Sequence, residues 1–150
     1  MSYIPNQEEL DLVEQISQGT YPGEQFTHRK HLHLAWLHAH SHEPHQAVLR
    51  MCADIQSYVK VLGAADKFNL TVTAVLAAEV VTRVIAQKNL QNFADWLSRH
   101  PDLEYHALDL LKGLYTPEQL QSAQAKETML WPDLAGFSYE VQEILEQAFS

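Results

Sequence analysis

Apolar residues recur along the chain at intervals of three and four positions, which is the spacing of an amphipathic helix. The pattern is clear near the start, where Leu10, Val13 and Ile16 follow Asn6 and Glu9, two residues spaced as in a capping box. No convincing hairpin signal interrupts it. The sequence therefore predicts an all-α protein.

Caps and helix breakers divide the chain into eight predicted helices. Thr27 is placed to cap one of them, Pro44 suits the first turn of the next, and Gly63 stands where a C-terminal cap is expected. The predicted helices cover residues 6–17, 28–40, 44–62, 70–87, 92–100, 103–114, 116–126 and 138–149. The segment 70–87 is apolar nearly all round and is predicted to be the central buried helix; its β-branched residues permit a strand, but its length favours a helix.

The length of the chain and the spacing of these segments predict one domain. A chain of 150 residues fits a single core, and no linker is long enough to separate two domains. Residues 1–150 are therefore predicted to fold as one compact single-domain bundle of six to eight helices.

Composition and charge narrow the classes of partner. Ten basic against nineteen acidic residues give a net charge of −9, which argues against nucleic acid or an anionic membrane as the main partner. No apolar run approaches the roughly 20 residues of a membrane-spanning helix, and the acidic start does not resemble a signal peptide, so a cytoplasmic protein is expected. The single cysteine, Cys52, excludes an internal disulfide and is expected to be an inert packing residue.

Seven of the nine histidines fall in residues 26–45. Because each helical residue turns about 100°, His28, His31, His38 and His42 fall within one sector of about 80°. His28 and His31 can share one metal ion, and so can His38 and His42. Imidazole suits zinc, iron, copper or nickel, so such a site would hold one transition-metal ion of unspecified identity. The alternative is no metal, with the imidazoles bonded to carbonyls or carboxylates or simply solvated.

A catalytic metal centre also needs a third protein ligand and an open position. No carboxylate occurs between Thr27 and His42, so the third ligand must come from another helix. The candidates are Asn69, Glu79, His106, Asp109 and Asp133. No Glu-x-x-His, His-Glu-x-x-His or Gly-x-Ser-x-Gly motif and no phosphate-binding glycine loop is present, which argues against the enzyme classes that use them.

Two further expectations concern residues outside that sector. His33 and His40 point away from it and are expected to be solvated. Glu79 is expected to pair with Arg83, one turn later on the buried helix. If Glu79 lay buried away from Arg83, its pKa would rise and it could act as a general base.

The segment FTHRKHLHLAWL resembles the opening signature, Trp/Phe-x-His-x-x-His-Leu-x-x-Ala-Trp, of a small uncharacterised bacterial family of helical proteins. KFNLTVT is similar to a mid-chain Lys-Tyr-His-x-Thr-x-Thr stretch of that family, and WPDL to a Pro-Asp-Leu element near its end. The matching positions are His28, His31, Lys67, Thr71, Thr73 and Asp133. The resemblance implies a recurrent set of residues across 26–135 and no particular reaction. This chain has Asn69 where the family has histidine. If that histidine is a third metal ligand in the family, this protein would bind metal weakly or use the amide oxygen of Asn69.

The favoured function is a small metal-dependent or acid/base enzyme acting on a small molecule. His28 and His31 would be its catalytic groups, or would bind a metal ion together with Asn69 and Asp133. The residues expected to line its substrate pocket are Lys67, Asn69, Thr73 and Trp36. The start of a buried helix would favour an anionic group in that pocket. The alternatives are a non-catalytic helical binding or interaction module, acting as a homodimer or with a protein partner, and a carrier that loads metal on exposed histidines.

The charge balance predicts a solubility minimum. If all nine histidines were protonated, the formal charge would rise to zero (−9 + 9). We therefore expect solubility to be lowest at about pH 5.5, where the net charge vanishes. A solubility curve between pH 8 and pH 5 measures this, and a flat curve would contradict it.

Overall fold

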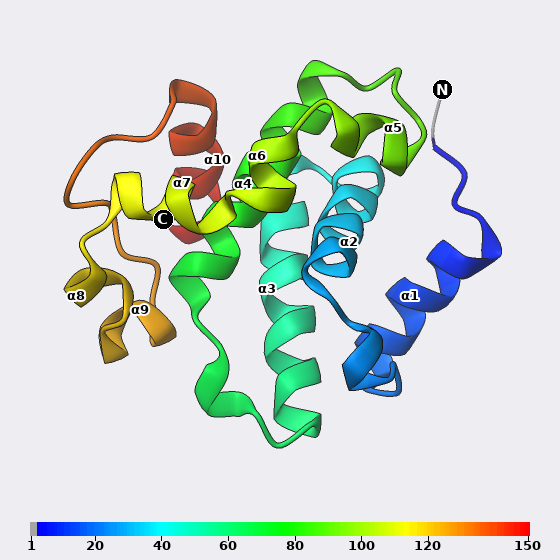
Figure 1. Cartoon of the computed structure of the whole chain (residues 1–150), viewed down its shortest axis with the longest axis horizontal. Helices are drawn as coiled ribbons and strands as arrows, with labels where there is room; N and C mark the ends of the chain where they lie inside the picture. Colours follow the sequence, from blue (N-terminus) through cyan, green and yellow to red (C-terminus); the bar gives the residue numbers. More distant parts are fainter. Residues whose placement is uncertain (1–2) are drawn as a thin grey trace.

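The structure, a computed structural model, describes residues 3–150 and contains ten α-helices in that range (Figure 1). They are α1 (Gln7–Gln18), α2 (His28–Ser41), α3 (Pro44–Val61), α4 (Leu70–Ala86), α5 (Phe93–Ser98), α6 (Pro101–Tyr105), α7 (Ala107–Leu114), α8 (Pro117–Leu120), α9 (Ala123–Glu127) and α10 (Tyr139–Phe149). Two turns of 3₁₀ helix, Gly23–Gln25 and Ala65–Lys67, precede α2 and α4, and the described residues form no strand. The all-α prediction is confirmed. None of these helices combines the length and the apolar character needed to cross a membrane.

The sequence predicts eight helices and the structure has ten in residues 3–150; the difference lies among the short helices. Six helices have eight residues or more, and the other four, α5, α6, α8 and α9, have four to six. The predicted helix 103–114 is divided at His106, which flanks both α6 and α7. The predicted helix 116–126 is divided where Ser122 caps α9 by accepting from the amide of Ala125. Periodicity does not reveal such breaks, because each half still turns an apolar residue toward the core.

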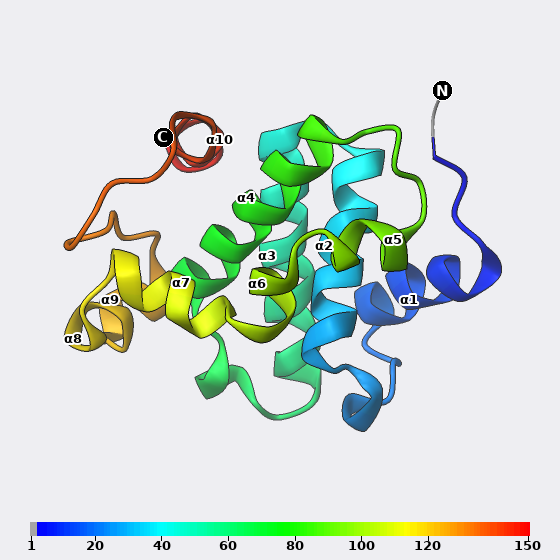
Figure 2. The ribbon, with the colours of Figure 1, turned by 45° about the horizontal axis from the view of Figure 1, so that its top comes forward.

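The centre of the bundle is α4, which packs against α2, α3, α9 and α10. Eight of its residues are buried, among them Ala74, Ala77 and Ala78, whose small side chains let neighbouring helices approach closely. The prediction of a central buried helix is confirmed. Figures 1 and 2 show α1 and α10 on opposite sides of this centre. Cys52 on α3 lies in the same core, where burial raises the pKa of its thiol to about 12, as suits an inert packing residue.

Asn, Thr and Ser side chains, which are favoured N-cap residues, accept hydrogen bonds at the starts of the helices. Seven N-cap side chains accept a hydrogen bond from the third amide of their helix: Asn6, Thr27, Asn69, Asn92, Thr116, Ser122 and Ser138. The backbone amide of Asn6 donates in turn to the carboxylate of Glu9 at 3.0 Å, which completes the predicted capping box. Gly19 ends α1 with a φ of 75°, and a Cβ atom there would lie 3.0 Å from Val61. A side chain at Gly19 is therefore disfavoured both by the backbone and by its neighbour.

The buried hydroxyl of Thr71 holds the segment around α9 against α4. Its Oγ1 lies 2.9 Å from the carbonyl oxygen of Ala125 and 2.8 Å from that of Thr128. It also accepts a hydrogen bond from the amide of Leu130 at 3.1 Å. A hydroxyl has one proton, so Thr71 donates to one carbonyl at a time while it accepts from Leu130. Residues 125–130 are thus tied to the central helix through one side chain.

Replacing Thr71 is expected to destabilise the protein. Thr71→Val should lower the free energy of unfolding by about 2 kcal/mol, because it leaves the Leu130 amide and two carbonyls without their buried partner. Thr82 on the same helix is the matched control: its buried hydroxyl oxygen has no hydrogen-bond partner within the part of the chain that the structure describes, so Thr82→Val should be neutral or stabilising. Chemical denaturation measures both variants, and an equal loss in the two would contradict the role given to Thr71.

Candidate functional site

A cavity of about 450 Å³ lies between α2, α3, α4 and the turn that precedes α4. Fifteen residues line it; ten are apolar, and the polar ones are His28, His31, Lys67, Asn69 and Thr73. Its volume lies within the range of about 300–1,000 Å³ that is typical of small-molecule pockets. Two polar stretches that are far apart in the sequence, residues 28–31 and 67–73, therefore meet at one cavity.

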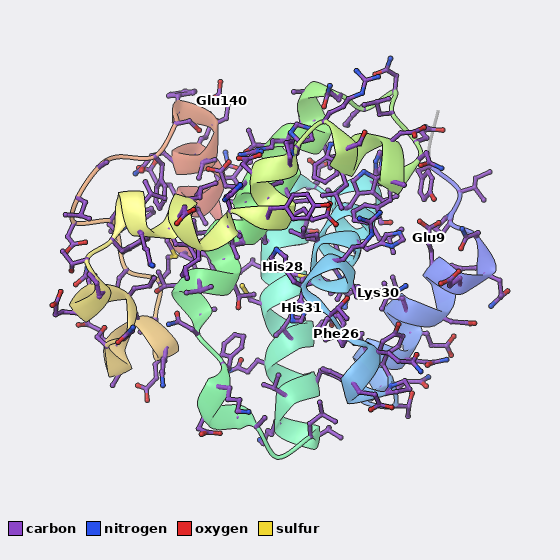
Figure 3. All side chains as sticks on the ribbon, in the orientation of Figure 1. Glu9, Phe26, His28, Lys30, His31 and Glu140 are labelled. Atoms are coloured by element: carbon purple, nitrogen blue, oxygen red, sulfur yellow. The ribbon has the colours of Figure 1, made fainter. Side chains whose placement is uncertain are left out.

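His28 stands exposed on the first turn of α2, where Figure 3 labels it beside α3. Its Nε2 lies 2.8 Å from the carbonyl oxygen of Leu103 in α6. A carbonyl oxygen only accepts hydrogen bonds, so Nε2 carries the proton in this contact and Nδ1 keeps the lone pair when the ring is neutral. The contact with α6 thus orients the imidazole and determines which nitrogen is basic.

His31 lies one turn further along α2 and is half-buried. Its Nδ1 is 2.8 Å from the carbonyl oxygen of Thr27, and its ring stacks on Phe26 with 3.9 Å between the centroids. Nδ1 therefore carries the proton and Nε2 the lone pair. Burial lowers the pKa of His31; the bond to Thr27 offsets this only in part, and the nearby His28 adds to it. The ring is consequently a neutral base at pH 7.

Asn69 and Thr73 shape the cavity wall through bonds within the protein. The Oδ1 of Asn69 accepts from the amide of Val72 at 3.1 Å, and its Nδ2 donates to the carbonyl oxygen of Leu120 at 2.8 Å. The hydroxyl of Thr73 donates to the carbonyl oxygen of Asn69 at 2.9 Å. The amide of Asn69 is thus engaged at both ends. Lys67, exposed on the preceding turn, adds a cationic side chain to the wall.

Two of the predicted site residues, Trp36 and Asp133, do not line the cavity. Trp36 is fully buried, and its ring packs against that of Tyr3 with 4.8 Å between the centroids. The helix turns by about 80° between His28 and Trp36, so the tryptophan faces the core on another side of α2. Asp133 is exposed, and its carboxylate accepts from the amide and the hydroxyl of Thr116 at 2.9 and 2.7 Å. The structure therefore brings together five of the predicted residues and leaves these two apart.

The nitrogens available to a metal ion at the cavity are Nδ1 of His28 and Nε2 of His31. Each ring donates its other N–H to a backbone carbonyl, which is a contact that histidine ligands commonly make. Asn69 and Asp133, the further ligands predicted, are both bonded within the protein. Across residues 3–150, no three or more His, Cys, Asp and Glu side chains are grouped so as to hold an ion.

The other candidates for a third ligand, Glu79, His106 and Asp109, also lie outside the cavity lining. Glu79 pairs with Arg83 at 3.4 Å, as predicted, but Arg83 binds Asp102 more closely through bonds of 2.7 and 2.8 Å. Burial raises the pKa of Glu79, and Arg83 offsets this only in part. The cluster joins α4 to α6. His106 and Asp109 form an exposed pair with 3.4 Å between Nδ1 and Oδ2.

The prediction that His33 and His40 are solvated is wrong. The Nε2 of His33 lies 2.6 Å from the buried carboxylate of Glu9, and its ring stacks on Phe93 at 4.0 Å between centroids. The hydroxyl of Tyr3 also donates to Glu9. Burial lowers the pKa of both His33 and His40. Tyr3 and α5 lie over this face of α2. The apolar periodicity of α2 does not predict that other segments cover this face.

The second predicted histidine pair, His38 and His42, is also outside the cavity lining. His38 is buried, and its Nε2 lies 2.9 Å from the carboxylate of Asp54 on α3. The rings of His38 and His42 lie side by side with 5.5 Å between their centroids. Asp54 thus gives His38 a buried partner between two helices, and of the two pairs only His28 and His31 reach the cavity.

No protein-family model, no curated protein and no solved structure matches the chain. The resemblance of the opening motif to a family of helical proteins therefore stays a prediction. The function of the chain is inferred from the residues of its own cavity.

His31 is expected to make stability depend on pH. Its pKa in the folded protein lies below the usual value of 6.5, so the unfolded chain binds this proton first as the pH falls. The corresponding stability is present above about pH 6.5 and is lost as the pH falls from there toward the folded pKa. Urea unfolding at about pH 7.5 and pH 5.5 should show a smaller loss for His31→Gln than for the wild type. Equal losses would show that His31 is not held neutral by the fold.

Proposed function

We propose that this protein is a small enzyme that acts on a small molecule bound in the cavity, with His28 and His31 as its acid/base groups. The observation that carries the proposal is that two imidazoles, each oriented by a backbone carbonyl, line the same cavity. A general base must hold a lone pair in a fixed direction, and both rings meet that requirement when neutral. The mixture of apolar walls and a few polar groups also suits a small-molecule site.

His31 is assigned the role of the base. Its lowered pKa keeps it neutral at pH 7, and its Nε2 is the nitrogen left free by Thr27. When Nε2 takes a proton from the bound molecule, the Thr27 carbonyl remains hydrogen-bonded to Nδ1–H and stabilises the resulting cation. His28 is exposed to solvent while it lines the same cavity, so it can exchange protons between water and the site.

A metal-dependent reaction would use the same two nitrogens. His28 Nδ1 and His31 Nε2 would hold the ion, and the ion would supply a Lewis acid or an activated water. Elemental analysis of the untagged protein separates the two versions of the proposal. About one ion per chain, lost in both His28→Ala and His31→Ala, would support the metal version, and no bound ion would support the acid/base version.

The proposal is tested by turnover. The untagged protein is incubated with a defined mixture of small metabolites, and mass spectrometry follows the consumption of each compound. We expect at least one compound to be consumed, with a rate reduced about 100-fold or more in His31→Gln. His45→Gln, on the first turn of α3 and outside the cavity lining, is the matched control and should retain the rate.

The opposite result has a distinct meaning. If compounds bind to the protein but none is consumed, or if consumption is equal in His31→Gln and the wild type, the enzymatic proposal is wrong. Binding without turnover would favour the non-catalytic binding module instead.

A further inference from the structure

We infer that the molecule bound in the cavity is a small anion with an apolar body, of the class of short aliphatic or aromatic carboxylic acids. The inference names the substrate class of the proposed enzyme and rests on that proposal for its catalytic meaning. It is carried by the charges that line the cavity, by the apolar walls, and by the polar groups that are already engaged inside the protein.

All the ionisable side chains that line the cavity are basic. They are His28, His31 and Lys67, and no Asp or Glu among residues 3–150 lines it. This is so although the chain has nineteen acidic residues against ten basic ones. A carboxylate that leaves water needs a cationic partner or hydrogen-bond donors. Lys67 supplies the cation, and His31 becomes a donor through Nε2 when its ring is protonated. A cationic ligand would find no carboxylate among the lining residues.

One carboxylate near His28 is already paired with a cation. Glu104 lines an adjacent hollow that shares His28 with the cavity, and its Oε2 lies 2.5 Å from Nη1 of Arg29. The guanidinium of Arg29 therefore balances this charge, and the cavity keeps its basic character at His28.

The body of the ligand must be apolar because two helices present hydrocarbon to it. α3 contributes Met51 and Ile55, and α4 contributes Val72, Leu76 and Val80. Burying apolar surface against such walls is favourable by about 25 cal/mol per Å². A chain or ring of a few carbons gains from this contact, whereas a sugar would bury hydroxyls without partners.

Few hydrogen-bond donors remain for a ligand with many polar groups. Both ends of the Asn69 amide are bonded to Val72 and Leu120, and the Thr73 hydroxyl proton is bonded to the Asn69 carbonyl. Among the lining residues that the structure describes, Lys67 is the permanent cation, which suits a ligand with a single anionic group. A single anionic head group on an apolar body matches that distribution.

His31 adds a dependence on pH. A carboxylate close to the lone pair of His31 Nε2 favours the protonated ring, so binding and protonation should strengthen each other. The charged or titratable groups that line the cavity with His31 are His28 on its own helix and Lys67 on the turn before α4; the lining residues of α3 and α4 are uncharged. Anion affinity should therefore rise as the pH falls.

Isothermal titration with three eight-carbon probes tests the ligand class: octanoate, 1-octanol and octylamine. At about pH 7 we expect octanoate to bind roughly tenfold or more tightly than 1-octanol, and octylamine to bind most weakly. Lys67→Gln should weaken octanoate binding about tenfold and leave 1-octanol binding unchanged. Lys88→Gln, an exposed lysine outside the cavity lining, is the matched control and should bind octanoate as the wild type does.

The pH dependence provides a second readout. Between about pH 8 and pH 6 the affinity for octanoate should rise in the wild type, and it should rise less in His31→Gln. Octanoate that binds no better than 1-octanol, or less tightly than octylamine, would overturn the inference. Failure of octanoate to bind at all would overturn it as well.

Failure of this inference and failure of the proposed function give different results. Selective octanoate binding without any His31-dependent turnover would leave the ligand class intact and contradict the enzyme. A neutral or cationic metabolite that is consumed in a His31-dependent way would support the enzyme and contradict the ligand class.

Discussion

A helix that is apolar on nearly every face is stable in water only when other helices surround it, and α4 imposes this constraint on the whole chain. The helices α2, α3, α9 and α10 pack against it. Along one stretch, residues 72–80, the surrounding side chains do not fill the space, and the cavity lies there. Apolar side chains of α2, α3 and α4 line most of it, and its polar groups come from the two segments 28–31 and 67–73.

The chemistry of the cavity depends on two backbone carbonyls. One belongs to Thr27, the cap residue of α2, and the other to Leu103 in α6. Because a carbonyl cannot donate a hydrogen bond, each contact determines which nitrogen of its histidine is protonated before any molecule binds. An acid/base group that is already aligned needs no reorganisation when its substrate arrives.

The sequence was informative where a local pattern reports a local structure. Apolar periodicity predicted the long helices, and the caps at Asn6, Thr27 and Asn69 marked three of their starts. The breaks at His106 and Ser122 were missed, because each short helix keeps the apolar spacing of the longer one predicted in its place.

The sequence predicts which residues belong to the candidate site better than it predicts how they are arranged in space. His28 and His31 are one turn apart, so their shared face follows from helix geometry. Their meeting with Lys67 depends on how α2 lies against the turn before α4, which no local pattern encodes. The contact between His33 and Glu9 was missed for the same reason, since the two residues come from different helices.

The double engagement of Asn69 limits what this position can become. Its amide closes the first turn of α4 and, through Leu120, anchors the end of α8. An imidazole in its place could reach either partner with one nitrogen and would then have a single nitrogen left. A third histidine in this cavity could bind a ligand only by giving up the helix cap at Val72 or the bond to Leu120. A new ligand at this position would therefore reduce the stability of the central helix or of its contact with α8.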